Sequence, residues 1–128
     1  MNSKEIGILG EKIAERYLRK KGYKVLEKNY FPKFVSGPLR GEIDIIAKKE
    51  DIIIFVEVKA IQQIQGKFFN PEDKVDFIKQ RKIIKTAEGW LMKNKIPLET
   101  KWQIDILAVE IDWDKQKAKI RHLKNAVA

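Results

Sequence analysis

The sequence contains no cysteine and a single histidine. The absence of cysteine excludes disulfide bonds, thiolate-ligated zinc and a cysteine nucleophile. No apolar stretch approaches the roughly 18 residues needed to cross a bilayer, and the first residues lack the apolar core of a secretory signal. We therefore expect a cytoplasmic protein that has no membrane partner.

The composition points to one folded domain, residues 1–128, with a strong positive charge. Hydrophobic residues make up 44% of the 128, which is enough for one real core. The 27 Lys and Arg residues exceed the 18 Asp and Glu residues, so the net charge is +9. A nucleic acid is the first partner to consider, because neutralising phosphates releases counterions. The excess of Lys over Arg equally fits a biased genome composition or a hot habitat.

Hydrophobic periodicity predicts an order of α-β-β-β-α-β-β. Apolar residues spaced three or four apart from Ile6 onward indicate a first helix that ends before Gly22. A cap-like Asn, Pro and acidic residues at 70–73 indicate the start of a second helix, which runs to about residue 93. A loop is expected over residues 31–40, and strands are expected at 23–27, 41–47, 52–59, 102–111 and 118–123.

The strand at 52–59 is nearly all apolar, which is typical of a central strand covered on both faces by helices. The helix that follows it allows a right-handed crossover to the strand at 102–111. The fold class is therefore α/β, with these two strands as parallel neighbours in a mixed sheet.

Polar residues end the otherwise apolar strand, and acidic residues lie on the strand before it. Side chains alternate along a strand, so Glu57 and Lys59 share one face, as do Glu42 and Asp44. Such residues are either ordinary solvent-facing positions of a hairpin or a site at the end of a buried strand.

A four-residue turn that pairs Ala47 with Ile52 would set Asp44 opposite Phe55 and Glu42 opposite Glu57. Asp44 and Glu57 would then be diagonal neighbours with Cα atoms roughly 7 to 8 Å apart. Both carboxylates could reach one Mg²⁺ ion, which prefers hard oxygen ligands. A one-residue slip would move Asp44 to the other face.

An ordered set of motifs resembles the YraN family, bacterial proteins regarded as endonucleases. That family is placed in the restriction-endonuclease-like, PD-(D/E)xK superfamily, which includes the archaeal Holliday junction resolvases. The resemblance covers nearly the whole chain and rests on residues 10–11, 41–47, 55–59, 79–83 and 104–105.

The resemblance implies a metal-dependent DNA endonuclease acting in repair or recombination. Asp44 and Glu57 would bind Mg²⁺ or Mn²⁺ together with the backbone carbonyl of Val58, and Lys59 would be the lysine of the Glu-x-Lys element. Glu11 would match the acidic residue of the first helix, at the side of the metal. Lys59 would orient the attacking water or neutralise developing charge, and Lys need not be the base.

Helical spacing alone places Glu11 away from the apolar stripe, so its role rests on the resemblance; Gly7 and Gly10 would permit close backbone approach. Glu42 and Gln80 are auxiliary candidates. Asp105 either supports the site or pairs with a Lys or Arg in the core, and His122 is assigned no role. The basic residues that could contact nucleic acid are Lys33, Arg40, Lys74, Lys79, Arg81, Lys82 and Lys85. Those on the second helix could equally form an ordinary solvent-exposed helix face.

The scarcity of Arg argues against extensive reading of base edges and favours structure-selective recognition of branched or single-stranded DNA. A homodimer would place two metal sites across a two-fold axis. Two other classes remain open. One is a nuclease-like module that binds nucleic acid without cutting it, and the other is an accessory subunit that would need an exposed apolar patch.

Overall fold

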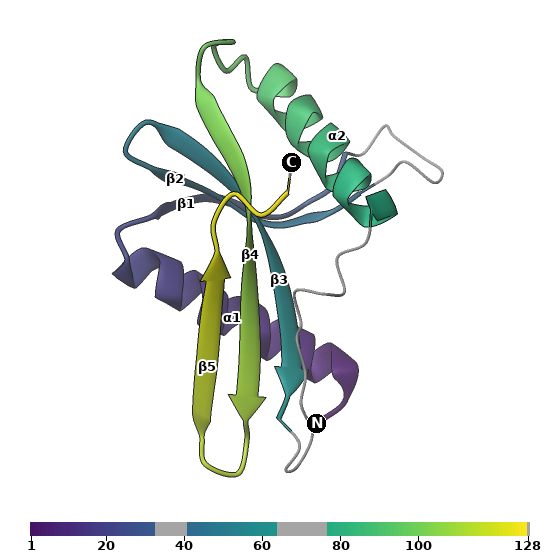
Figure 1. Ribbon diagram of the computed structural model, residues 1–128, viewed down its shortest axis with the longest axis vertical. Coiled ribbons are helices and arrows are strands. Elements are labelled where there is room, and N and C mark those ends of the chain that lie inside the picture. The colour runs from purple at the N-terminus through teal and green to yellow at the C-terminus, as the bar shows by residue number, and fades with distance from the viewer. Residues whose placement is uncertain (33–40, 64–76, 128) are drawn as a thin grey trace.

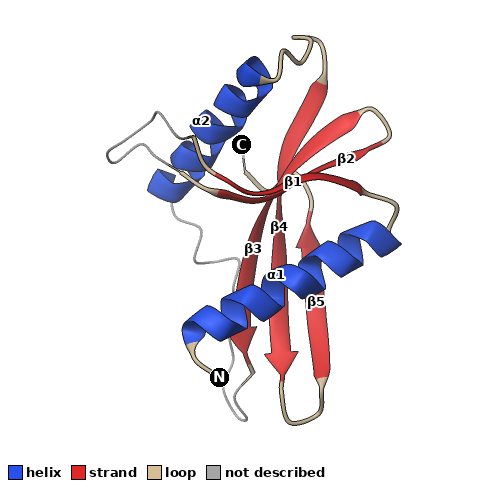
Figure 2. Cartoon of the chain, turned by 180° about the vertical axis from the view of Figure 1, so that it is seen from behind, coloured by secondary structure: helices blue, strands red, loops and turns tan. Residues whose placement is uncertain are grey.

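The computed structural model describes residues 1–32, 41–63 and 77–127, and it shows a five-stranded sheet with one helix on each face (Figures 1 and 2). The predicted order α-β-β-β-α-β-β is confirmed. The elements are α1 (Ser3–Lys20), β1 (Lys24–Tyr30), β2 (Ile43–Lys49), β3 (Ile52–Gln62), α2 (Phe77–Lys93), β4 (Lys101–Asp112) and β5 (Lys117–Leu123).

The sheet has the strand order β1-β2-β3-β4-β5. All neighbours are antiparallel except β3 and β4, which run parallel and are connected through α2. The expected mixed sheet with β3 at its centre is therefore confirmed. Beyond their paired region, β1 and β2 splay away from the lower halves of β3, β4 and β5 (Figure 1).

The first helix covers the lower half of one sheet face (Figure 2). It starts three residues before the predicted Ile6, because Asn2 and Glu5 form a capping box. Gly22 follows its end with φ of 92°, a backbone conformation that favours glycine. Ala14 and Leu18 are fully buried against β3 and β4.

The second helix covers the upper part of the opposite face (Figure 1). Ile83, Ala87 and Trp90 on the side of α2 that faces the sheet are buried, and Trp90 packs edge-on against Phe55 with ring centroids 5.7 Å apart. The predicted start at residues 70–73 lies outside the described residues.

The β2–β3 hairpin differs from its predicted register. Lys49 pairs with Ile52, and Ala47 pairs with Ile54 rather than Ile52. The turn has two residues, 50 and 51, instead of four, and Glu50 adopts a φ of 55°. The shift is two residues, which preserves the face of the side chains in the paired region, residues 45–49.

Asp105 belongs to a buried network on the α1 side of the sheet. One carboxylate oxygen lies 2.7 Å from Nε2 of His122, and the other accepts hydrogen bonds from the Gln103 side chain and the Asn125 backbone. Nδ1 of His122 lies 3.1 Å from the hydroxyl of Tyr17 on α1. Asp105 therefore has a histidine partner in place of the Lys or Arg we considered.

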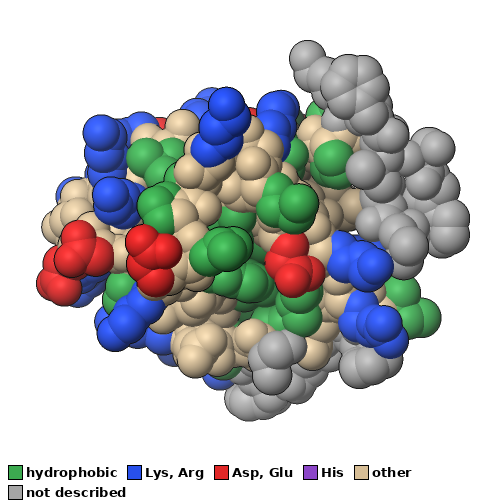
Figure 3. All heavy atoms as spheres, turned by 90° about the horizontal axis from the view of Figure 1, so that it is seen from above, with side chains coloured by type: hydrophobic (Ala, Val, Ile, Leu, Met, Phe, Trp, Pro, Cys, Tyr) green, Lys and Arg blue, Asp and Glu red, His purple; other side chains and the backbone are tan. Residues whose placement is uncertain are grey.

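Hydrophobic side chains are exposed among charged ones at the end of the molecule viewed in Figure 3. Met92 and Leu98 are highly exposed, and with Leu91, Ile96 and Trp102 they line a hollow of about 420 Å³. An accessory subunit would need such a patch. Within the described residues, no helix is long and apolar enough to cross a membrane.

Candidate active site

Asp44 lies where β2 parts from β3. The observed pairing ends at Ile45 and Val56, and continuing its register sets Asp44 opposite Glu57. The Oδ2 atom of Asp44 accepts a 2.7 Å hydrogen bond from the backbone N–H of Val58, so the side chain replaces a ladder hydrogen bond at the split. Asp44 is therefore a direct neighbour of Glu57 rather than the predicted diagonal one.

The environment of Asp44 disfavours its negative charge. Burial raises the pKa of Asp44 to about 8, and repulsion from Glu57 and Glu11 acts in the same direction, while the Val58 hydrogen bond lowers it. The protein by itself therefore does not supply enough positive charge near Asp44 to compensate the ionised carboxylate. A bound cation would relieve this deficit.

Glu57 is buried and contacts two lysines from different elements. Its Oε1 atom lies 3.3 Å from Nζ of Lys59 on β3 and 2.9 Å from Nζ of Lys79 on α2. The pKa of Lys59 is lowered, first by burial and then by the neighbouring Lys79. The structure therefore brings Lys59 and Lys79 together at the carboxylate that faces Asp44.

Glu11 reaches the same place from α1, although periodicity alone directs it to solvent. It is half-buried and lines one hollow with Asp44, Glu57 and Val58. Burial raises the pKa of Glu11, as does repulsion from Glu57, while its contact with Asp44 lowers it. Three carboxylates from α1, β2 and β3 thus act on one another.

The close approach of α1 to β3 depends on Gly10. A Cβ at position 10 would overlap the Cβ of Ala60 on β3. Gly7, which we expected to have the same role, has no neighbouring atom within 4 Å of such a Cβ. Of these two glycines, Gly10 is therefore the one that lets the helix backbone beside Glu11 approach the sheet closely.

Gly10→Ala is expected to destabilise the protein by about 1–2 kcal/mol, because the overlap with Ala60 outweighs the gain in helix propensity. The matched change Gly7→Ala in the same helix should stabilise it by about 0.5–1 kcal/mol. Urea unfolding of both variants, and of Gly10→Ala combined with Ala60→Gly, tests this. The double variant should recover much of the loss, and purely additive effects would contradict the contact.

A second hollow, of about 480 Å³, opens from Asp44 toward α2. Its lining includes Glu42, Glu57, Lys79 and Lys82, and Glu42 lies exposed at its rim. The chain passes close to α2 at the Gly41 position, where a Cβ would lie 2.7 Å from the hydroxyl of Thr86.

The other predicted contacts are placed less centrally. Gln80 is half-buried, and Arg81 and Lys85 are exposed on α2; these three residues do not line the three hollows beside Asp44 that are described here. Lys33, Arg40 and Lys74 lie outside the described residues.

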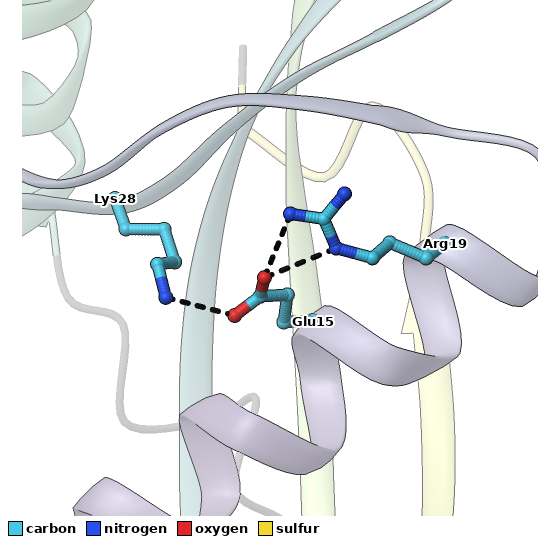
Figure 4. Close-up of polar contacts among 3 residues, drawn as sticks. All are labelled: Glu15, Arg19 and Lys28. Carbon is cyan, nitrogen blue, oxygen red and sulfur yellow. Dashed lines mark hydrogen bonds and ion pairs between the residues drawn. The ribbon is translucent and has the colours of Figure 1, made fainter.

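A third hollow beside Asp44 contains an ion-pair cluster that the sequence did not reveal (Figure 4). Glu15 on α1 accepts hydrogen bonds from Arg19 at 2.8 and 3.0 Å and from Lys28 on β1 at 3.0 Å. Hydrogen bonds from Lys28 and then Arg19 lower the pKa of Glu15. Exposed pairs of this kind add little stability, but this one links α1 to β1 next to Glu11.

The donor set fits a hard divalent cation. Asp44, Glu57, Glu11 and the Val58 carbonyl are oxygen donors of the kind Mg²⁺ and Mn²⁺ prefer. The raised pKa values of Asp44 and Glu11 show that the negative charge of these two carboxylates is not fully compensated by the protein. Among the described residues, no three acidic or histidine side chains lie close enough together to hold a metal ion without some rearrangement. Glu57 would have to exchange a lysine contact for the metal.

Comparison with known proteins places these residues in a described family. A family model described as "Uncharacterised protein family UPF0102" matches residues 10–109. A UPF0102 protein of Clostridioides difficile is 45% identical over 98% of this chain and 99% of its own length. UPF0102 proteins of Caldanaerobacter subterraneus subsp. tengcongensis and Dictyoglomus turgidum are each 40% identical over 98% of this chain, and over 97% and 99% of their own lengths. The matched segment contains all the carboxylates described above.

Proposed function

The chain belongs to the UPF0102 family, also called the YraN family, and from its site we propose that it is a metal-dependent endonuclease that hydrolyses phosphodiester bonds in DNA. The observation that carries the proposal is the buried Asp44 carboxylate on β2, which accepts a hydrogen bond from the β3 backbone and lies beside the Glu57 and Glu11 carboxylates. Two lysines contact Glu57. Family membership itself specifies no activity, because the family is described as uncharacterised.

Asp44, Glu57 and the Val58 carbonyl would hold Mg²⁺ or Mn²⁺, with Glu11 as a further ligand. When bound, the metal supplies a water of lowered pKa and polarises a phosphoryl oxygen. Lys59 is placed to orient that water or to neutralise developing charge, since its ammonium group already lies at Glu57. The protein's own contribution is thus a fixed, partly desolvated arrangement of charges.

Lys79 and Lys82 would contact the phosphate backbone from α2. Both line the hollow that opens from Asp44, so a phosphate there would meet positive charge opposite the carboxylates. The small number of Arg residues favours selection by DNA structure, such as branches or single strands, over selection by sequence. A role in repair or recombination would fit that preference, and a homodimer would place two such metal sites across a two-fold axis.

The decisive experiment compares wild-type protein with Glu57→Gln on labelled duplex, single-stranded, flap and four-way-junction DNA, with Mg²⁺, Mn²⁺ or EDTA. We expect metal-dependent cutting that falls at least about 100-fold in the variant, because Glu57 would be a metal ligand and its carboxylate contacts Lys59. Glu88→Gln, on the exposed surface of α2, is the matched control and should cut normally. Binding without cutting by the wild type would favour a nucleic-acid-binding module instead.

A further inference from the structure

The sheet face that carries Glu57 and Lys59 continues across β4 and β5 beyond α2. Glu57 pairs with Ile106, which is buried in the core under α2. Two residues further along, Lys59 pairs with Ala108, and Ala108 pairs with Arg121. Because residues two apart share a face, these three residues form the next row of the same face.

Arg121 is therefore two strand spacings from Lys59, or about 10 Å between backbones. The small side chain of Ala108 lies between them. Of the described helices, α2 crosses only the upper part of this face, and the lower halves of β3, β4 and β5 have no helix over them on this side (Figure 1). A bound polymer could pass from Lys59 to Arg121 without meeting a helix of the described chain.

The exposed side of β5 is basic along its length. Lys117, Lys119 and Arg121 are all exposed and lie on this face at intervals of about 7 Å. Within the described part of the chain, neither Lys117 nor Lys119 forms an ion pair within 4 Å, although acidic residues of β4 are their strand partners. Cations in such a row suit a chain of phosphates.

We propose that Lys117, Lys119 and Arg121 bind the sugar-phosphate backbone of the nucleic-acid segment that flanks the phosphate to be cleaved. The inference rests on the proposed nuclease function, because that function puts the reacting phosphate beside Glu57 and Lys59. Beyond that function, the inference specifies how much of the substrate the protein contacts: several nucleotides on the β5 side of the cleaved bond. The contacts are to the backbone, so they carry no sequence preference.

The test measures how binding depends on salt for the double variant Lys119→Gln/Arg121→Gln. The matched control is Arg16→Gln/Lys20→Gln, which removes the same charge from exposed positions on α1, across the sheet. Fluorescence anisotropy with labelled duplex and single-stranded DNA of about 20 nucleotides, in EDTA and between about 50 and 200 mM salt, gives the slope of log K against log salt concentration.

We expect the slope on duplex DNA to fall by about 1.8 in the β5 variant, since each lost phosphate contact lowers it by about 0.9, and by less than about 0.5 in the control. Equal slopes in the two double variants would overturn the inference, as would a wild type that binds neither DNA. If the β5 variant does not fold by circular dichroism, Lys117→Gln/Lys119→Gln replaces it, because both positions are exposed.

The cleavage assay separates this inference from the proposed function. If the wild type cuts DNA but both double variants share one slope, the nuclease proposal stands and the β5 surface is overturned. If the β5 variant alone loses slope but the wild type cuts nothing, the surface is supported as a nucleic-acid-binding face and the nuclease proposal fails.

Discussion

Asp44→Asn is expected to abolish metal-dependent cleavage and, at the same time, to stabilise the metal-free protein near pH 8. Asparagine removes the charge but can still accept the hydrogen bond from Val58. Burial and then Glu57 raise the pKa of Asp44 to about 8, so ionising this carboxyl group costs free energy in the folded protein. The residue most important for the proposed chemistry should therefore be one that weakens the fold.

The sign of the pH dependence follows from the raised pKa. The contribution of Asp44 to stability is fully present below its unfolded value of 3.8 and is lost as the pH rises through its folded value of about 8. The wild type should therefore lose stability relative to Asp44→Asn across that window, by at most about 1.4 kcal/mol per pH unit. Urea unfolding in EDTA at several pH values measures the difference.

Asp51→Asn provides the control, because Asp51 is exposed in the β2–β3 turn. It should show no pH-dependent gain over the wild type. If the proposed site binds Mg²⁺ through Asp44, the added ion should raise the melting temperature of the wild type and of Asp51→Asn but not of Asp44→Asn. If the wild type and Asp44→Asn are equally stable at pH 8, then burial and the neighbouring carboxylates do not destabilise the ionised form of Asp44.

The order of elements was predictable because each helix and strand has a clear hydrophobic period. The register of the β2–β3 hairpin was not, because the charged residues 48–51 suit a two-residue or a four-residue turn equally well. The error placed Asp44 opposite Phe55 instead of opposite Glu57, a shift of two residues. The grouping of acidic residues with Lys59 therefore survived a wrong register, since strand faces depend only on parity.

The contacts between helices and strands could not be predicted from the spacing of residues within each element. Periodicity assigned Glu11 to solvent, whereas the close packing of Gly10 on Ala60 and the splaying of β2 from β3 bring it to Asp44. Lys79 was expected to contact nucleic acid, but its contact with Glu57 depends on where the crossover places α2. Such distances arise from tertiary packing, so only the resemblance to a family could anticipate Glu11.

His122 shows the same limit for a buried pair. A lone histidine in a terminal strand gave no reason to assign it a partner, and Asp105 was the only ionisable residue between Ile104 and Val109. Their pairing follows from the β4–β5 register, in which Leu107 lies opposite His122 and Asp105 is two residues away on the same face. The register itself depends on the turn at residues 113–116.

Asp105→Asn is expected to lower the free energy of unfolding by about 3–5 kcal/mol, because it breaks a fully buried, hydrogen-bonded pair. Burial raises the pKa of Asp105, but hydrogen bonds from His122, the Asn125 backbone and Gln103 outweigh it and leave the pKa lowered. The stability from this group is therefore fully present above the unfolded value of 3.8 and is lost as the pH falls through the folded value. The gap between wild type and variant in urea unfolding should shrink below about pH 4.

Asp112→Asn on the same strand is the control, since Asp112 accepts one exposed hydrogen bond, from the backbone of Lys115 at 3.2 Å. It should cost less than about 1 kcal/mol. Asp105 lies on the α1 side of the sheet and Glu57 on the α2 side, so the folded Asp105→Asn protein should cut DNA as the wild type does. A loss of cleavage without a loss of stability would instead show that Asp105 acts on the site through the intervening strand, and that the buried pair with His122 is dispensable for the fold.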